Sequence, residues 1–110
     1  MNVERRARIC ALNDRLRRHH INGRILLSHG VVAKGTDFIR AALRDIALVD
    51  SFDEDNDPYG EHDFGSVEVG GERLFWKIDY YDQMLRGHAV DPADGDKCVR
   101  VMTVMLAYEY

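Results

Sequence analysis

The feature that most constrains the fold of this chain is a glycine pair between two alternating runs of residues. Gly70 and Gly71 separate residues 63–69 from residues 72–80. In the second run, Leu74, Trp76 and Ile78 fall on one face of an extended chain. A two-residue glycine connection suits a tight hairpin because glycine accepts positive φ angles. The pattern therefore predicts a β-hairpin over about residues 63–80.

Three helices and one further strand are predicted around this hairpin. Residues 3–19 carry Ile9, Leu12 and Leu16 at helical spacing, and residues 36–49 present a second apolar helical face. Residues 24–28 are short and apolar and are bounded by glycines, which is typical of a buried strand. A last helix is predicted to begin at residues 91–94, where acids and a proline come before a run with apolar residues at helical spacing. Its apolar side would be formed by Val99, Met102, Met105 and Leu106.

The predicted order is α-β-α-β-β-α, which indicates an α+β fold. The hairpin and the strand at residues 24–28 would form a small antiparallel sheet with helices packed on one face. A chain of 110 residues is the size of one domain, and it contains no internal repeat or linker. We therefore expect a single domain over residues 1–110.

Cysteine usage and hydropathy favour a cytoplasmic protein. Cys10 and Cys98 lie far apart and belong to no Cys-x-x-Cys or Cys/His pair with metal spacing, so we expect buried thiols in a reducing compartment. No apolar run approaches the ~20 residues of a membrane span. The charged first residues are not followed by the apolar stretch of a secretory signal. No membrane partner is expected.

Charge is divided unevenly along the chain. Residues 1–50 contain ten Lys/Arg and five Asp/Glu, whereas residues 51–110 contain five Lys/Arg and fourteen Asp/Glu. Such asymmetry can mark a partner of opposite charge. It is equally consistent with two halves that attract each other once folded.

The acidic segment of residues 53–63 resembles a calcium-binding loop in its first residues, but it lacks the residues that such a loop requires at its sixth and twelfth positions. Asp53, Asp55 and Asp57 stand at alternate positions, as in a loop that binds a hard cation. However, the sixth position is Pro58 instead of glycine, and the twelfth is Phe64 instead of glutamate. No calcium site, and no other metal or cofactor, is predicted.

Five residues are weak candidates for catalysis. Glu61, His62 and Asp63 are contiguous, and strand alternation would aim Glu61 and Asp63 to one side and His62 to the other. One imidazole with carboxylates could hold Mg²⁺ or Mn²⁺, or could act as a base with an orienting acid. The alternative is that His62 and Asp63 structure the turn before the hairpin. Lys77 and Asp79 share a strand face, where a catalytic amine is one interpretation and a surface salt bridge is the other.

The first helix offers an alternative function, nucleic-acid binding. Six arginines on one helix form an electrostatic footprint, although acids interrupt them and the whole chain is acidic. These residues, with two histidines, are Arg5, Arg6, Arg8, Arg15, Arg17, Arg18, His19 and His20. A solvated helix face that pairs with the acidic turn is the competing interpretation.

Several segments resemble an uncharacterised bacterial family, domain of unknown function 3768. They are residues 8–14 (RICALND), 55–65 (DNDPYGEHDFG), 75–82 (FWKIDYYD), 91–94 (DPAD) and 106–110 (LAYEY). The resemblance covers nearly the whole chain. It implies a short stand-alone bacterial protein, often carried on plasmids or other mobile elements, without an established activity or cofactor. Small acidic proteins of that kind are often inhibitors of bacterial defence, including anti-CRISPR proteins.

We therefore expect a non-catalytic binding protein that docks an acidic turn on a basic protein surface. A segment rich in carboxylates and aromatic residues is suited to recognition of arginine and lysine. The contact residues would be Asp53, Asp55, Asp57, Tyr59 and Glu61. The alternatives are a small metal-assisted hydrolase or nuclease at the Glu61-His62-Asp63 cluster and a nucleic-acid binder that uses the first helix.

Overall fold

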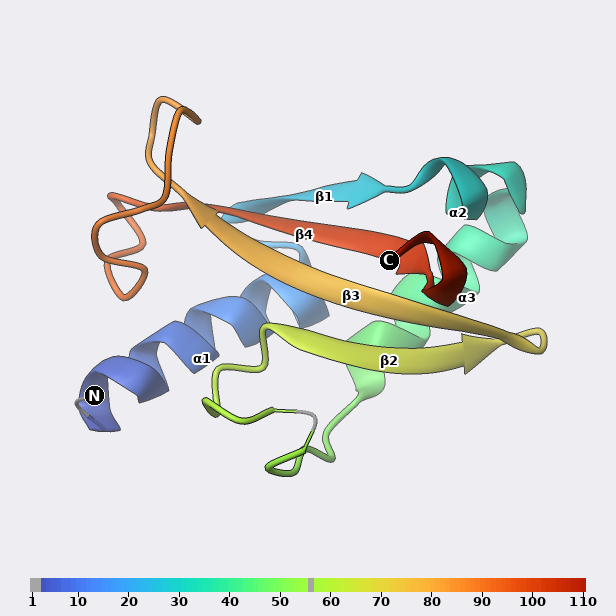
Figure 1. The fold of residues 1–110 in the computed structure, drawn as a ribbon, viewed down its shortest axis with the longest axis horizontal. Coiled ribbons are helices and arrows are strands. Elements are labelled where there is room, and N and C mark those ends of the chain that lie inside the picture. The colour runs from blue at the N-terminus through green and yellow to red at the C-terminus, as the bar shows by residue number, and fades with distance from the viewer. Residues whose placement is uncertain (1–2, 56) are drawn as a thin grey trace.

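In a computed structural model, the chain forms a four-stranded sheet with two long helices on one side (Figure 1). The structure describes residues 3–55 and 57–110; Asn56, which belongs to the acidic segment and to the family motif, lies outside them, as do Met1 and Asn2. The helices are α1 (Val3–His19), α2 (His29–Ala33), α3 (Thr36–Leu48) and a short 3₁₀ helix, η1 (Ala107–Glu109). The strands are β1 (Gly23–Leu27), β2 (Phe64–Val69), β3 (Glu72–Tyr81) and β4 (Val99–Leu106), in the order β1-β4-β3-β2. The predicted α+β class is confirmed.

The predicted hairpin is present with the predicted turn. Strands β2 and β3 pair antiparallel, with Phe64 opposite Lys77 and Val69 opposite Glu72. Gly70 and Gly71 have φ angles of 56° and 82°, a conformation that residues with a Cβ adopt at a cost. The glycine pair therefore sets the register of the sheet's outer strand.

The last predicted helix is wrong, because its apolar residues form a central strand. Strand β4 pairs antiparallel with β3 and parallel with β1, so the sheet is mixed instead of purely antiparallel. Both faces of β4 are covered: Met102 and Val104 have no exposed surface, and Val101 and Met105 are less than 10% exposed. In a strand that is buried on both faces, apolar residues do not alternate with polar ones, so the spacing of its apolar residues can match that of a helix. The acids expected to start that helix form a turn instead, in which the Asp91 carboxylate accepts the N–H of Ala93.

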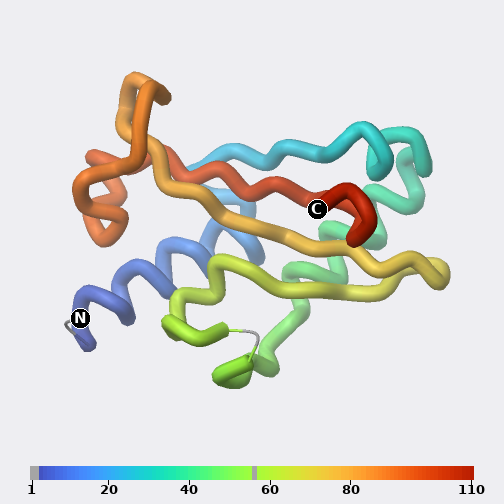
Figure 2. Tube along the Cα trace, in the orientation of Figure 1, coloured from blue at the N-terminus to red at the C-terminus, as the bar shows by residue number. Residues whose placement is uncertain are grey.

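The core lies between the sheet and the helices α1 and α3. Trp76, Ile78 and Leu74 point from β3 into this layer, as their alternation predicts. They meet Leu16 of α1 and Ile46 of α3, which are both fully buried. Among the described helices, α1 and α3 leave the opposite face of the sheet uncovered, and the short η1 lies against β3 at one end of that face, where Figure 2 shows the C-terminal segment turning back. None of the described helices combines the length and the apolar character that crossing a bilayer would require.

The side-chain carboxylate of Glu109, near the C-terminus, joins η1 to the start of α2. Glu109 accepts hydrogen bonds from the Ser28 hydroxyl at 2.6 Å and from the N–H groups of Gly30 at 2.9 Å and Leu106 at 2.7 Å. These bonds, that from Ser28 first, lower the pKa of the Glu109 carboxyl below its usual value. A folded-state pKa below the unfolded-state pKa stabilises the fold above the unfolded value, and this contribution disappears as the pH falls through the folded value.

We therefore expect Glu109→Gln to reduce the free energy of unfolding at neutral pH and to converge with the wild type in acid. Urea unfolding of both proteins from neutral to acidic pH measures this difference. The Glu68→Gln variant removes one carboxylate from the exposed side of β2 and controls for net charge. The prediction would be contradicted if the difference in free energy of unfolding between Glu109→Gln and the wild type were the same at every pH.

Candidate functional site

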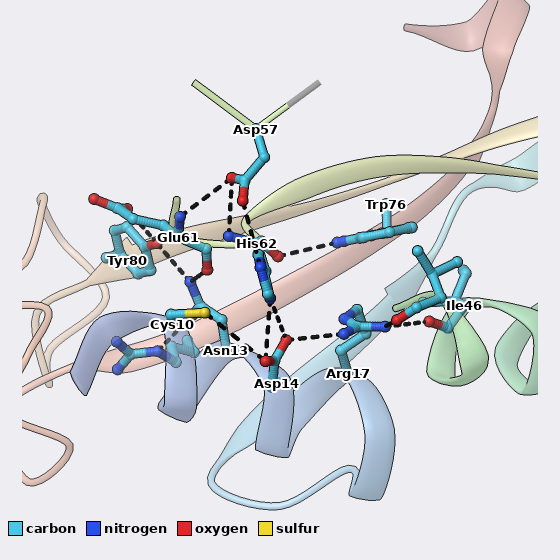
Figure 3. A network of polar contacts seen from close by, with 12 residues as sticks. Cys10, Asn13, Asp14, Arg17, Ile46, Asp57, Glu61, His62, Trp76 and Tyr80 are labelled. Atoms are coloured by element: carbon cyan, nitrogen blue, oxygen red, sulfur yellow. Dashed lines mark hydrogen bonds and ion pairs between the residues drawn. The ribbon is translucent and has the colours of Figure 1, made fainter. Parts of the chain in front are cut away.

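A network of polar side chains connects the acidic segment to α1 (Figure 3). Asp57 organises the turn: its Oδ1 accepts the backbone N–H groups of Glu61 at 3.2 Å and His62 at 3.0 Å. Only 8% of Asp57 is exposed. This residue therefore acts inside the protein, where it holds the chain that leads into β2.

The His62 ring lies between two carboxylates. Its Nδ1 is 2.9 Å from Oδ1 and 3.1 Å from Oδ2 of Asp14, and its Nε2 is 3.5 Å from Oδ2 of Asp57. The ring of Phe52 stacks on it with a centroid distance of 3.7 Å and an interplanar angle of 7°. The position and the plane of the imidazole are therefore fixed from three directions.

Arg17 is a cation with no exposed surface, and it holds Asp14 from the other side. Its Nη2 donates to Asp14 Oδ1 at 2.9 Å, and its Nη1 donates to the carbonyls of Ile46 at 2.6 Å and Val49 at 2.8 Å. Burial raises the pKa of the Asp14 carboxyl, but hydrogen bonds from Arg17 and His62 outweigh it and lower the pKa overall. Asp14 is therefore a stabilised carboxylate at the centre of the network.

A second branch of the network uses the Glu61 carboxylate. The Tyr80 hydroxyl donates to Glu61 Oε1 at 2.9 Å and accepts from Asn13 Nδ2 at 2.8 Å. Asn13 Oδ1 accepts in turn from Nε of the buried Arg100 at 2.8 Å. Burial is the main cause that raises the pKa of Tyr80 above its usual value. Glu61 is thus enclosed and hydrogen-bonded, an arrangement that holds the turn against the core.

The five catalytic candidates do not form one cluster. Glu61 and His62 join the network beneath the turn, whereas Lys77 and Asp79 form an ion pair of 3.2 Å on the sheet face opposite α1 and α3. The expected alternation fails because His62 has a φ of 58°, a left-handed conformation that turns the chain out of a regular strand. Glu61 and His62 therefore both reach side chains of the α1 side.

The five predicted contact residues are also divided. Asp57 and Glu61 are buried, at 8% and 9% exposure, whereas Asp53, Asp55 and Tyr59 are exposed. Asp53 Oδ1 accepts the N–H of Asp55 at 2.9 Å, which shapes the exposed part of the turn. Only part of the predicted contact surface is thus presented to solvent.

The exposed part borders an aromatic hollow, which we define by four rings: Tyr59, Phe64, Phe75 and Tyr110. It has a volume of about 470 Å³ and is also lined by Asp55 and Asp63. The Phe64 and Phe75 ring centroids are 5.2 Å apart, and Tyr110 meets both rings edge to face at 5.4 and 5.6 Å. This hollow opens on the uncovered face of the sheet.

The Asp63 carboxyl at this hollow lies in an unfavourable environment for its negative charge. Burial is the first cause that raises its pKa, and the nearby carboxylates of Glu61, Asp57 and Asp79 add to the effect. A positive group placed in the hollow would relieve this repulsion. The arrangement is therefore suited to a cation that also has an apolar or planar surface.

The sequence was compared with known protein families. The sequence profile of a family described as "Protein of unknown function (DUF3768)" matches residues 27–109. The chain belongs to this family. Searches of curated proteins and of solved structures gave no significant match. The matched region includes His62 and three rings of the hollow, Tyr59, Phe64 and Phe75; Asp14 and Arg17 of α1 precede it, and Tyr110 follows it.

Sequence patterns alone did not identify the α1 residues of the network in this DUF3768 member. Asn13 and Arg17 lie four residues apart and share the buried side of α1 with Ile9 and Leu16. Polar residues at core spacing were therefore the signal that could have identified them. Burial of Arg17, and the 3.1 Å ion pair of Arg5 with Asp91, also show that arginines of α1 pair within the fold.

The thiol of Cys10 lies beside the network and is protonated at neutral pH. Burial, followed by the charges of Asp14 and Asp57, raises the pKa of Cys10 to about 12. The Sγ atom is 3.8 Å from Asp14 Oδ2. Without a bound cation, this thiol does not supply a nucleophilic thiolate.

Proposed function

We propose that this DUF3768 protein is a non-catalytic protein-binding module that receives an arginine-containing basic segment of a partner in its aromatic hollow. The observation that carries the proposal is the combination of aromatic rings and carboxylates on the sheet face opposite α1 and α3. Asp53 and Asp55 of the acidic turn lie on the exposed side of the same region.

The chemistry of the hollow favours a guanidinium group. Arginine stacks on aromatic faces and donates paired hydrogen bonds to carboxylates. Tyr59 and Tyr110 are 64% and 69% exposed, so their rings remain available to a partner. Asp55 and Asp63 supply the negative charge, and Asp53 extends it along the turn.

The wider setting of this proposal follows from the family resemblance. The partner would be a cytoplasmic bacterial protein, and the module would act as an inhibitor of the kind that mobile elements carry against bacterial defence. The hydrolase alternative has weaker support, because the Glu61 carboxylate is hydrogen-bonded by Tyr80 and the five candidates are divided among the network, the hollow and a surface ion pair. Nucleic-acid binding has weaker support because Arg17 is buried.

A peptide titration followed by NMR tests the proposal. The probe is a short arginine-rich peptide, and its matched control replaces each arginine with citrulline, which keeps the shape but removes the charge. We expect the arginine peptide to shift the amide signals of Ser66, Phe75 and Tyr110, which lie at the hollow. Tyr59→Ala should weaken binding about two- to fivefold through lost cation–π contact.

The variants Asp55→Asn and Glu68→Gln provide a matched pair. Both remove one exposed carboxylate, but only Asp55 lines the hollow. Weaker binding by Asp55→Asn alone is the expected result. Equal binding of the citrulline peptide, or shifts confined to residues away from the hollow, would refute the proposal.

A further inference from the structure

Three chemically different ligand groups meet on the α1 side of the acidic turn. The Sγ of Cys10, a carboxylate oxygen of Asp14 and a ring nitrogen of His62 all lie within 4.8 Å of one another. Cys10 and Asp14 are four residues apart on α1, so they project from the same face of the helix. We propose that these three side chains form a Zn²⁺ site with a fourth position open to water.

The donor set matches the preference of zinc. Zn²⁺ is bound by thiolate sulfur, imidazole nitrogen and carboxylate oxygen, usually in a tetrahedron. Metal–ligand distances of about 2.0–2.3 Å place neighbouring ligand atoms roughly 3.3–3.8 Å apart in that geometry. The Cys10 Sγ to Asp14 Oδ2 separation is already 3.8 Å, and the His62 Nδ1 to Asp14 Oδ2 separation is 3.1 Å. The Cys10 Sγ and the His62 nitrogen lie within 4.8 Å of each other, so these two side chains would approach by no more than about 1.3 Å to seat the ion.

The surroundings of His62 match those of a metal ligand. A histidine that binds metal through one ring nitrogen usually donates its other N–H to a carboxylate. Here Nδ1 lies 2.9 and 3.1 Å from the two carboxylate oxygens of Asp14, while Nε2 lies 3.5 Å from Asp57 Oδ2. The stacked Phe52 ring holds the imidazole plane, and Arg17 holds Oδ1 of Asp14 while Oδ2 stays directed to Cys10. Asp57, Phe52 and Arg17 provide these contacts, and none of the three is itself a proposed zinc ligand.

The local charges balance when zinc binds. The thiolate of Cys10 and the carboxylates of Asp14 and Asp57 carry three negative charges, which Arg17 and a divalent ion neutralise. Zinc displaces the thiol proton, which passes to solvent. About a quarter of the side-chain surface of His62 and of Asp14 is exposed, so water has access to the fourth position. The site lies outside the aromatic hollow, and its test does not depend on peptide binding.

Cobalt substitution tests the site, because Co²⁺ takes the geometry of Zn²⁺ and reports it spectroscopically. The probe is Co²⁺ added to the reduced protein, followed by displacement with Zn²⁺. We expect the intense visible bands of tetrahedral cobalt and a near-ultraviolet band from thiolate-to-cobalt charge transfer. Zinc should abolish both bands.

The two cysteines form a matched pair of variants. Cys10→Ser should lose the charge-transfer band and bind Zn²⁺ at least tenfold more weakly, whereas Cys98→Ser should match the wild type, because Cys98 lies outside the proposed site. In the wild type, Zn²⁺ should also slow alkylation of Cys10, a measurement that needs no variant. A band that persists in Cys10→Ser, an octahedral cobalt spectrum, or alkylation of Cys10 at an unchanged rate would overturn the proposal.

Discussion

Replacing Arg17 with methionine is expected to lower the free energy of unfolding by about 3–5 kcal/mol, the range for breaking a buried ion pair by removing one partner. Methionine keeps most of the alkyl chain but donates no hydrogen bonds. The carbonyls of Ile46 and Val49 would then lose a buried donor, and Asp14 would lose its paired cation. The guanidinium also lies 5.3 and 5.4 Å from the ring centroids of Phe52 and Trp76, so its loss removes two cation–π contacts.

Arg18→Met is the matched control for this substitution. Arg18 is the next residue on α1 and is exposed, so the same change in charge and helix propensity occurs there without the buried contacts. We expect Arg18→Met to change the free energy of unfolding by less than about 0.5 kcal/mol. Chemical denaturation of both variants measures the difference. Similar stability of the two variants would show that the buried contacts of Arg17 contribute little.

A methyl group at position 65 is expected to destabilise the protein by about 3 kcal/mol, at the upper end of the usual cost of overpacking. A Cβ on Gly65 would lie 2.1 Å from the nearest Trp76 ring atom and 2.4 and 2.6 Å from the next two. Trp76 is fully buried in the core, so its ring cannot move away without displacing other side chains. Gly65→Ala therefore forces either the ring or strand β2 to shift.

A double-mutant cycle tests this physical reason. Trp76→Phe removes the outer ring atoms that the new methyl would meet, although it leaves a cavity of its own. Gly65→Ala and Trp76→Phe should therefore be less destabilising together than the sum of their separate effects. Ser66→Ala, an exposed neighbour on β2, controls for the general cost of substitution in this strand. Strict additivity would contradict a direct clash.

The hairpin was predictable from local residues because its signals are local. Two glycines at the turn and a period of two on either side determine both the pairing and the inward face. Strand β4 was not predictable in this way. It lies between β1 and β3 in the sheet, and residues on both of its faces are buried, so its sequence shows no period that separates a strand from a helix.

The candidate site was predictable only in part, for a related reason. The sequence identified the acidic segment, the aromatic hairpin and His62 as its unusual features. It could not show that Glu61 turns inward, because its partner Tyr80 belongs to β3, or that the turn in which Asp57 holds the N–H groups of Glu61 and His62 packs against α1. Nor could it show that Asp14, which Arg17 holds, approaches His62, since Asp14 and His62 are 48 residues apart in the sequence.

By itself, the sequence determined the α+β class, the hairpin register and the family of this protein. Tertiary structure alone decided which carboxylates are buried, which remain exposed, and that Tyr110 completes the aromatic hollow. The physical reason is that periodicity and turn propensity act over a few residues, whereas burial and charge pairing depend on segments that meet only in the folded chain.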